Sequence, residues 1–448
     1  MLLSSFIRRK VVCWFLAAAS PLIAFGQTNF SPQGVEYAIA GVFPGDQAYP
    51  CVAINSSGGC LVWQDNSVTT NGLRIRAERL NSGFTSLDGT NFVVSAVAKA
   101  KTTGDQEKPQ VASLPGGGAV VVWQGGKTGL QQIFARFLNS AGSFITKDLR
   151  VSAFPRINQT NPQVAVLANG NVVVVWSSFG QDGSMEGIFA RIFSATGSPL
   201  GAEFQVNQSY LYNQRSPALS ALSDGRFVVV WISEMQRADP ASVGVYARIF
   251  NASGLAAGGE FAVDATNTVS LCANPSVAGS PLGGFAVGWS QKDGVVQAIV
   301  SNPNDATGVA PGAAGFPAIS WSTNGWDVFG RLFDAHGSPI TSPFRLNCYT
   351  YGDQFAPKFS SLGAAYMAVW TSIGQDGSWE GVFGQFITPA GNLVFTNDLQ
   401  VNTTWISRQF QPAVAADGVN RFLVVWSSFS ASTSLDLFAQ TYLQTGNQ

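Results

Sequence analysis

The sequence predicts an all-β fold of repeated four-stranded units, and three observations support this prediction. A proline and a tryptophan recur together in seven copies along residues 27–448. Each copy holds four short strand-like runs separated by turn residues, and its second run is continuously apolar. A strand with both faces covered needs such a run, and neighbouring units of the same kind supply the cover. Four antiparallel strands in a repeat of about 50 residues are typical of a β-propeller blade, so we predict a seven-bladed β-propeller, with eight blades as the alternative.

The copies are marked most regularly by their prolines and tryptophans. The prolines are Pro50, Pro109, Pro162, Pro217, Pro275, Pro357 and Pro412. The tryptophans are Trp63, Trp123, Trp176, Trp231, Trp289, Trp370 and Trp426. Neighbouring prolines lie 53 to 59 residues apart, except that 82 residues separate the fifth from the sixth. The fifth copy therefore carries an insertion at about residues 291–327, and the run FPAISW inside it is the reason for the eight-blade alternative.

The third copy shows the expected strands most clearly. Its second run covers residues 172–176, its third run 188–193 and its fourth run 203–207. The last copy instead ends after its third run, at residues 437–443, and residues 35–41 match the missing fourth run. We expect the N-terminal strand to complete the last blade, within one domain over residues 27–448, because this arrangement removes an exposed sheet edge.

The first residues carry an export signal. Arg8, Arg9 and Lys10 precede an apolar run over residues 11–25 that is too short to span a bilayer, which is typical of a cleaved signal peptide at residues 1–26. We expect a secreted protein, in the periplasm or at the cell surface, and no membrane span. Lys and Arg total 25 against 26 Asp and Glu, so the chain lacks the positive charge of a nucleic-acid-binding protein.

The third copy also carries a family resemblance. The run VVVVWSSFGQDGSMEGIFARIF, followed by EFQVN, resembles a repeat of large exported bacterial proteins that are mostly uncharacterised and often stand beside calcium-binding repeat modules. The resemblance covers about 420 residues. It implies a propeller fold and almost nothing about activity, and copies 1, 4, 5 and 7 lack the GQDGS run.

Two polar positions recur in the copies. A glutamine stands three residues before six of the seven prolines, and we expect its amide to tie a turn to the neighbouring blade, with ligand binding as the alternative. An arginine recurs in the third run as Arg136, Arg191, Arg248 and Arg331. We interpret that position as an outward-facing polar one.

Loops between the second and third runs must gather with the interblade linkers on one face, which we call the loop face. The GQDGS loops of copies 3 and 6 lie there and offer weak calcium candidates, Asp182 with Glu186 and Asp376 with Glu380. Calcium needs about six to eight oxygen ligands, and each loop offers only two carboxylates. Asp-Gly is also a favoured sequence for a tight turn, so we favour a turn role for these aspartates.

Three tryptophans fall outside the repeat register, in loops that we assign to the loop face. Trp321 and Trp326 belong to the insertion and Trp379 to a GQDGS loop. Exposed aromatic rings there could stack on a glycan or anchor a protein, so we predict a ligand site at these residues. A passive surface loop is the alternative.

Export also brings an oxidising compartment and leaves four mature cysteines. Cys51 and Cys60 flank one hairpin turn, and we predict a disulfide between them. A bridge between Cys272 and Cys348, in successive linkers, is the less favoured pairing.

We expect a monomeric, non-catalytic exported propeller that binds a glycan or a protein. His336 is the single histidine, and no nucleophile elbow, zinc motif or phosphate-binding loop appears. One alternative is a glycan-active enzyme that works with carboxylates alone, because such an enzyme needs no histidine. The other is a structural component of the cell surface or matrix. We expect no cofactor unless the GQDGS loops bind calcium.

Overall fold

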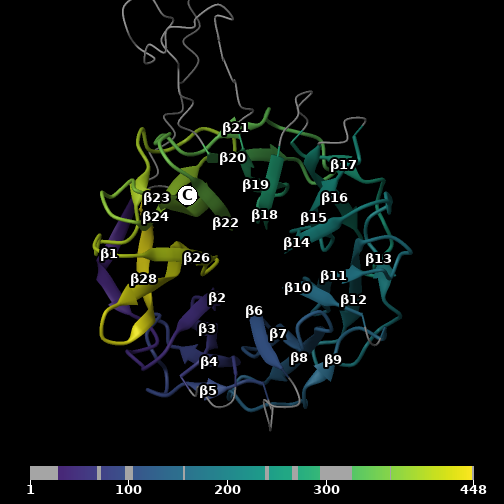
Figure 1. Ribbon diagram of the computed structural model, residues 1–448, viewed down its shortest axis with the longest axis horizontal. Coiled ribbons are helices and arrows are strands. Elements are labelled where there is room, and N and C mark those ends of the chain that lie inside the picture. Colours follow the sequence, from purple (N-terminus) through teal and green to yellow (C-terminus); the bar gives the residue numbers. More distant parts are fainter. Residues whose placement is uncertain are drawn as a thin grey trace, which may run out of the picture.

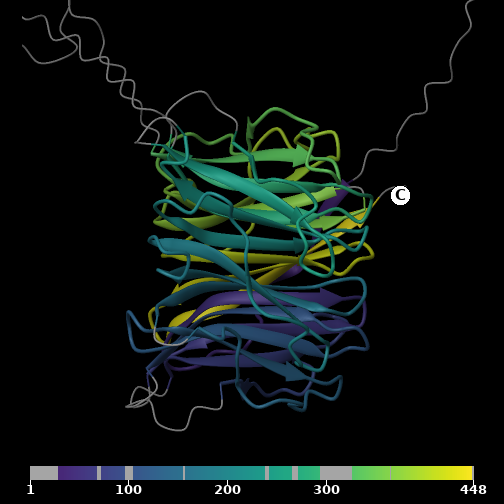
Figure 2. The same cartoon turned by 90° about the vertical axis from the view of Figure 1, so that its right-hand side faces the viewer.

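The computed structural model describes residues 29–67, 72–95, 104–154, 157–237, 242–264, 271–292, 325–363 and 365–445. The regular structure of these residues consists of strands, which form small sheets around a central axis (Figure 1). Seen from the side, each sheet stacks against the next (Figure 2). The predicted all-β fold of four-stranded antiparallel sheets with a propeller-like arrangement is confirmed. The described residues contain no helix of the length and apolarity that crossing a membrane requires.

Each repeat contributes strands at four positions, from the axis outward. The innermost strands are β2 (Gln47–Asn55), β6 (Asp105–Ser113), β10 (Gln159–Val166), β14 (Gln214–Ala221), β18 (Leu271–Gly279), β22 (Gln354–Leu362) and β26 (Gln409–Ala416). The second strands are β3 (Gly58–Asp65), β7 (Ala119–Gly126), β11 (Val172–Phe179), β15 (Phe227–Glu234), β19 (Phe285–Lys292), β23 (Ala365–Ile373) and β27 (Arg421–Ser430). The third strands are β4 (Arg74–Leu80), β8 (Gln132–Leu138), β12 (Glu186–Phe193), β16 (Val243–Phe250), β20 (Trp326–Phe333), β24 (Glu380–Ile387) and β28 (Ser434–Thr445). The outer strands are β5 (Phe92–Val93), β9 (Leu149–Arg150), β13 (Phe204–Gln205), β17 (Phe261–Ala262), β21 (Phe344–Arg345), β25 (Leu399–Gln400) and β1 (Asn29–Ala38).

Five of the sheets have four strands, and the strands from β14 to β21 form an eight-stranded sheet because Val243 pairs in parallel with Leu271. The N-terminal strand β1 pairs with the C-terminal strand β28, and the two lie side by side in Figure 1. This strand begins at Asn29, six residues before the predicted run. It is longer than the other outer strands because β28 offers a longer edge, up to Thr445.

The apolar second strands form the core between neighbouring sheets. In β11, Val172, Val174 and Trp176 pack with the preceding sheet, whereas Val173 and Val175 pack with the following one. Alternate side chains of a strand point to opposite faces, so both faces of β11 need apolar residues. The seven repeat tryptophans belong to these second strands and are 0–1% exposed, which matches the packing role that their position predicts.

Each innermost strand contains a bulge at its repeat proline. The ladder register shifts there in all seven described strands, as between Thr160 and Gln163 of β10. Proline cannot donate to a ladder and is tolerated at bulges and on edge strands. The residue before the proline takes a left-handed conformation, with φ between 50° and 56°: Tyr49, Lys108, Asn161, Ser216, Asn274, Ala356 and Gln411. The bulges turn these side chains toward the axis.

Candidate functional site

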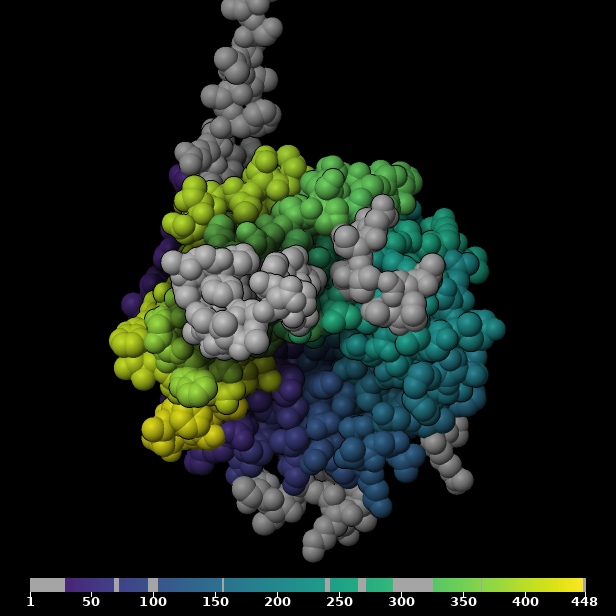
Figure 3. Space-filling model, turned by 45° about the horizontal axis from the view of Figure 1, so that its top comes forward, coloured from purple at the N-terminus to yellow at the C-terminus, as the bar shows by residue number. Residues whose placement is uncertain are grey.

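A central channel runs between the innermost strands, and the molecular surface is hollowed at the same place (Figure 3). Its cavity of about 400 Å³ is lined by all seven innermost strands. The residues before the repeat prolines form one ring of the lining, and those after the prolines form a second ring: Cys51, Gln110, Gln163, Ala218, Ser276, Lys358 and Ala413. Apolar residues such as Val52, Val164 and Leu219 follow farther along the strands, so the channel passes from a polar to an apolar lining.

Hydrogen bonds between sheets hold the first ring in place. The backbone N–H of Asn161 donates to Oε1 of Gln124 at 2.9 Å, and that of Ser216 donates to Oγ of Ser177 at 3.2 Å. Gln124 and Ser177 each follow a repeat tryptophan in the preceding sheet. Ser290 also follows a repeat tryptophan, and its Oγ accepts from the backbone N–H of Ala356 at 2.9 Å. The bulges at Asn161, Ser216 and Ala356 are therefore each held by the sheet before them.

Two carboxylates and an arginine lie on the loop face, where sheets β10–β13 and β14–β17 meet. Arg215 donates from Nε to Oε1 of Glu234 at 2.7 Å, and Asn213 donates from Nδ2 to Oε2 of the same carboxylate at 2.8 Å. Asn213 also accepts from the backbone N–H of Glu186 at 3.4 Å. Asn213 therefore links the start of β12 to the Glu234 carboxylate.

Glu186 is half-buried at the start of β12. Burial raises the pKa of its carboxyl, and the neighbouring Glu234 carboxylate raises it further, whereas the cations Arg215 and Lys108 oppose this shift. In the described part of the chain, the Glu186 carboxylate forms no hydrogen bond or ion pair. A carboxyl with a raised pKa beside a second carboxylate that is paired with an arginine is an arrangement in which one carboxyl can act as an acid and the other as a base.

Lys108 connects these carboxylates to the channel. It belongs to the channel lining, and its Nζ donates to Oδ1 of Asn161 at 2.7 Å. Desolvation lowers the pKa of Lys108, and the charges of Glu107 and Glu186 oppose this shift. Glu107 itself accepts from Nε2 of Gln124 and of Gln131, both at 3.1 Å. We call the residues Lys108, Glu186, Arg215 and Glu234 the carboxylate cluster.

The second GQDGS loop gives its glutamate a different partner. Arg408 donates from Nε and Nη2 to the two carboxylate oxygens of Glu380, at 2.7 and 2.5 Å. This bidentate pair neutralises Glu380. Arg408 directly precedes the recurring glutamine of its copy, Gln409. In the copy whose linker lies beside Glu186, the residue at this position is Asn213. The two glutamates share a sequence motif but differ in charge balance.

The calcium candidates have roles within their loops. Asp182 accepts from the backbone N–H of Ser184 at 3.0 Å, and Asp376 does so from Ser378 at 3.0 Å. Both aspartates therefore accept a hydrogen bond within a tight turn, the role that the sequence favoured over calcium binding. Among the described residues, no group of three or more His, Cys, Asp or Glu side chains could hold a metal ion.

The three predicted ligand-binding tryptophans separate in the structure. Trp379 is 70% exposed in the loop before β24. The placement of Trp326 in a loop was wrong, because it begins strand β20, pairs with Lys292 and is half-buried. Trp321 lies outside the described residues. The sequence reasoning missed Trp405, which is 55% exposed in the linker before β26. The loop of Trp379 and this linker are joined, since the backbone N–H of Ser407 donates to Oγ of Ser378 at 3.1 Å.

The recurring glutamine is structural. All six described copies are 0–3% exposed: Gln47, Gln106, Gln159, Gln214, Gln354 and Gln409. Gln214, for example, donates from Nε2 to the carbonyl of Leu211 at 2.7 Å and accepts from Asn207 at 3.2 Å. The amide thus ties the interblade linker to the preceding sheet, as predicted.

The recurring arginines link successive sheets, so the interpretation of their position as merely outward-facing was wrong. Arg191 donates from Nη1 to the carbonyl of Val151 in the preceding sheet at 2.9 Å, and from Nε to the carbonyl of Gly201 in its own sheet at 3.1 Å. Arg136, Arg248 and Arg331 repeat this bond with Val94, Val206 and Val263. A planar guanidinium with several donors can reach two carbonyls at once.

The predicted disulfide between Cys51 and Cys60 is not formed, and both residues are free thiols. Cys51 pairs with Val62 across the hairpin and Cys60 pairs with Ala53. The two cysteines therefore occupy diagonal positions, whose Cβ atoms lie farther apart than the roughly 4 Å of a disulfide. Cys272 and Cys348 are likewise not joined by a disulfide.

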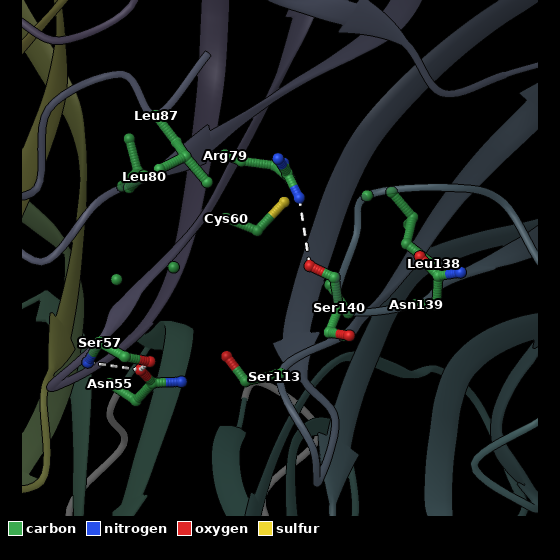
Figure 4. Close-up of a pocket in the computed structure, with 16 residues that line it drawn as sticks. Asn55, Ser57, Cys60, Arg79, Leu80, Leu87, Ser113, Leu138, Asn139 and Ser140 are labelled. Atoms are coloured by element: carbon green, nitrogen blue, oxygen red, sulfur yellow. Dashed lines mark hydrogen bonds between the residues drawn. The ribbon is translucent and has the colours of Figure 1, made fainter.

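A second pocket lies on the opposite face, between sheets β2–β5 and β6–β9 (Figure 4). Arg79 crosses it and donates from Nη1 to the carbonyl of Ser140 at 3.1 Å. Burial raises the pKa of the Cys60 thiol to about 12, so this thiol is protonated and a poor nucleophile. Its described lining residues include no carboxylate.

No family model and no curated protein match this sequence, so the resemblance to exported repeat proteins stays a prediction. Solved structures do match its fold. A polysaccharide lyase is 9% identical, with a TM-score of 0.54, and the match covers 90% of this chain and 91% of the lyase. An α-L-arabinanase from Penicillium chrysogenum is 13% identical, with a TM-score of 0.47 over 74% of this chain and 92% of its own. The β-propeller domain of the Trilobed protease from Pyrococcus furiosus is 9% identical, with a TM-score of 0.48 over 89% and 94%.

These comparisons correct the prediction of a non-catalytic protein. At such identities the likeness shows the fold alone, but it is a fold that the polysaccharide lyase uses for catalysis. The prediction relied on the lack of histidine and of known motifs. It overlooked Arg215, Glu234 and the two channel lysines, because no repeat motif contains them. The sequence did contain a signal for the two lysines. Lys108 and Lys358 each stand next to a repeat proline, and the residues next to the repeat prolines of the other copies are uncharged.

Proposed function

We propose that this chain is a glycan-active enzyme whose site is the carboxylate cluster, with Glu186 as the proton donor. The observation that carries the proposal is the raised pKa of this half-buried carboxyl, beside a second carboxylate that Arg215 holds. Glu380, at the same place in the other GQDGS loop, is neutralised by Arg408 instead. A structural role for the motif would not require this difference.

The chemistry of the cluster suits cleavage of a glycosidic bond. Hydrolysis and elimination both need a proton for the oxygen of the leaving sugar, and a carboxyl with a raised pKa supplies it near neutral pH. Glu234 is the second group, and its carboxylate is oriented by Arg215 and Asn213 to act as a base. The similarity in fold to a polysaccharide lyase supports a glycan as the substrate.

Exposed aromatic residues on the loop face support the same substrate class. Trp379 and Trp405 project from segments that are hydrogen-bonded to each other through Ser378 and Ser407. Tyr212 is 46% exposed, and its linker is bonded to the other GQDGS loop, since its backbone N–H donates to Oγ of Ser184 at 3.1 Å. Aromatic rings of this kind offer a flat apolar surface with a polar edge, which suits the faces of sugar rings.

We also infer the context in which this enzyme works. Four strands for each repeat and the pairing of β1 with β28 support a propeller of seven blades, closed by the N-terminal strand. The basic and apolar N-terminal residues support export, which would give the enzyme access to extracellular polysaccharides.

The test is cleavage of a panel of neutral and acidic polysaccharides, with reducing ends and the ultraviolet absorbance of unsaturated sugars as readouts. Glu186→Gln should lower the rate on the substrate by about 100-fold or more, because it removes the acid. Glu380→Gln, the matched substitution in the other loop, should keep the rate. Equal rates in Glu186→Gln and the unchanged chain would refute the assignment, as would the absence of cleavage across the panel.

A further inference from the structure

The channel lining is positively charged. Lys108 and Lys358 lie in its two rings, and the described lining contains no aspartate or glutamate. Lys358 is exposed to the channel space, on strand β22 directly after Pro357. In the part of the chain that the structure describes, neither lysine forms a salt bridge. Two like charges thus face one enclosed space without a carboxylate between them.

We propose that this channel binds the anionic group of an acidic glycan, a carboxylate or a sulfate, between Lys108 and Lys358. This inference depends on the proposed function in one respect: it identifies the ligand of the channel as the substrate of the carboxylate cluster. The anion site itself is inferred from the geometry of the channel. A cavity of about 400 Å³ has room for a substituted sugar ring.

Glu107 and Glu186 act on Lys108 from outside the channel lining, but the lining residues around the two lysines fit an anion better than a cation. Amide side chains stand around them in the two rings, among them Asn161, Asn274 and Gln411. Their N–H groups can donate to oxyanion oxygens. Desolvation lowers the pKa of Lys358, and the charge of Lys108 lowers it further, whereas Cys51 opposes this shift. A bound anion would offset both unfavourable contributions.

The location of Lys108 connects the anion to the reaction. Its charge acts on Glu186, so the channel and the carboxylate cluster are within electrostatic reach of each other. A glycan chain with its acidic group held in the channel would therefore place a neighbouring glycosidic bond on the loop face. This arrangement selects acidic polysaccharides over neutral ones of the same length.

The experiment measures binding by calorimetry with three probes: a uronic acid oligosaccharide, a sulfated oligosaccharide and a neutral oligosaccharide of equal length. We expect at least one acidic probe to bind, more weakly as salt increases, and the neutral probe not to bind. Lys358→Met and Lys108→Met should each weaken binding tenfold or more, whereas Lys358→Arg should retain it. Lys147→Met, at an exposed lysine after β8, is the control for general charge. Thermal melting shows which variants are folded.

The outcomes separate this inference from the proposed function. Acidic binding that survives in Lys358→Met, or equal binding of the neutral probe, overturns the anion site. Cleavage of a neutral glycan that depends on Glu186 would leave the proposed function standing without the anion site. Lysine-dependent binding of an acidic probe with no cleavage would leave the anion site standing without the enzyme.

Discussion

Sheets β10–β13 and β22–β25 carry the same GQDGS loop, but only one of them builds a candidate site. The loops have the same conformation: Gly180 donates to the carbonyl of Met185 at 2.5 Å, and Gly374 donates to that of Trp379 at 2.6 Å. The glutamates that follow differ because the next sheet differs, with Asn213 beside Glu186 and Arg408 beside Glu380. In a repeat protein, the chemistry of a motif therefore depends on the linker that follows it.

The largest expected effect comes from making the first loop resemble the second. Asn213→Arg should give Glu186 the bidentate partner that Glu380 has, which lowers the pKa of the Glu186 carboxyl and removes the acid at neutral pH. We expect glycan cleavage to fall by about 100-fold. The pH–rate profile should shift toward lower pH, since less Glu186 is protonated at each pH.

Arg408→Asn is the reciprocal control for this prediction. It leaves Glu380 without its partner and does not touch the carboxylate cluster, so the cleavage rate should stay unchanged. A similar loss in both variants would mean that the loops matter for folding and not for catalysis.

The next largest effect concerns the bonds between sheets, which also differ in these two regions. Arg191 reaches the preceding sheet, but Gln385 at the same position donates to carbonyls of its own sheet, those of Phe395 and Asn397. Arg191→Gln should therefore remove a charge-assisted bond between sheets and lower the free energy of unfolding by about 2 kcal/mol. Chemical denaturation measures this change. Arg150→Gln, at an exposed arginine of β9, should leave the denaturation midpoint in place.

The repeat made the scaffold predictable from the sequence. The third strand, predicted at residues 188–193, is β12 (Glu186–Phe193), and the Pro and Trp positions mark the bulge and the core in each copy. The exceptions arise where a side chain bonds to another sheet. Arg191 has a polar pattern that also suits a solvated strand face, and its bond with Val151 joins residues that are 40 positions apart.

The carboxylate cluster was less predictable for the same reason. Glu186 was singled out, but as a calcium candidate, because its partners Arg215 and Glu234 belong to the next sheet and to no shared motif. Trp326 was assigned to a loop because the length of strand β20 depends on its pairing with β19. The repeat pattern indicates which strands pair, but it gives neither the ends of each pairing nor the side-chain bonds between sheets.

A smaller effect is expected from the exposed aromatic residues of the second loop. Trp379 occupies the position that Met185 holds in the first loop, and both are exposed. If Trp379 stacks on a sugar ring, Trp379→Ala should weaken binding of the glycan substrate by about two- to tenfold. Met185→Ala should change the affinity less, because it removes no aromatic ring. An unchanged affinity in Trp379→Ala would exclude this residue from the binding surface.

The smallest effect is on stability, and its dependence on pH distinguishes the two glutamates. The pKa of Glu186 is raised in the folded chain, so its contribution to stability is fully present below the ordinary glutamate pKa of about 4.3 and is lost as pH rises through the folded value. Glu186→Gln should therefore be as stable as the unchanged chain at neutral pH, or more stable by up to about 1 kcal/mol, and should lose this advantage in acid. Glu380→Gln removes an ion pair whose arginine is 53% exposed, so it should cost at most about 1 kcal/mol at neutral pH. Urea denaturation at neutral pH and near pH 4 measures both differences. A loss of stability in Glu186→Gln that is the same at both pH values would show that Glu186 is a packing residue. It would also show that the pKa of its carboxyl is not raised in the folded chain.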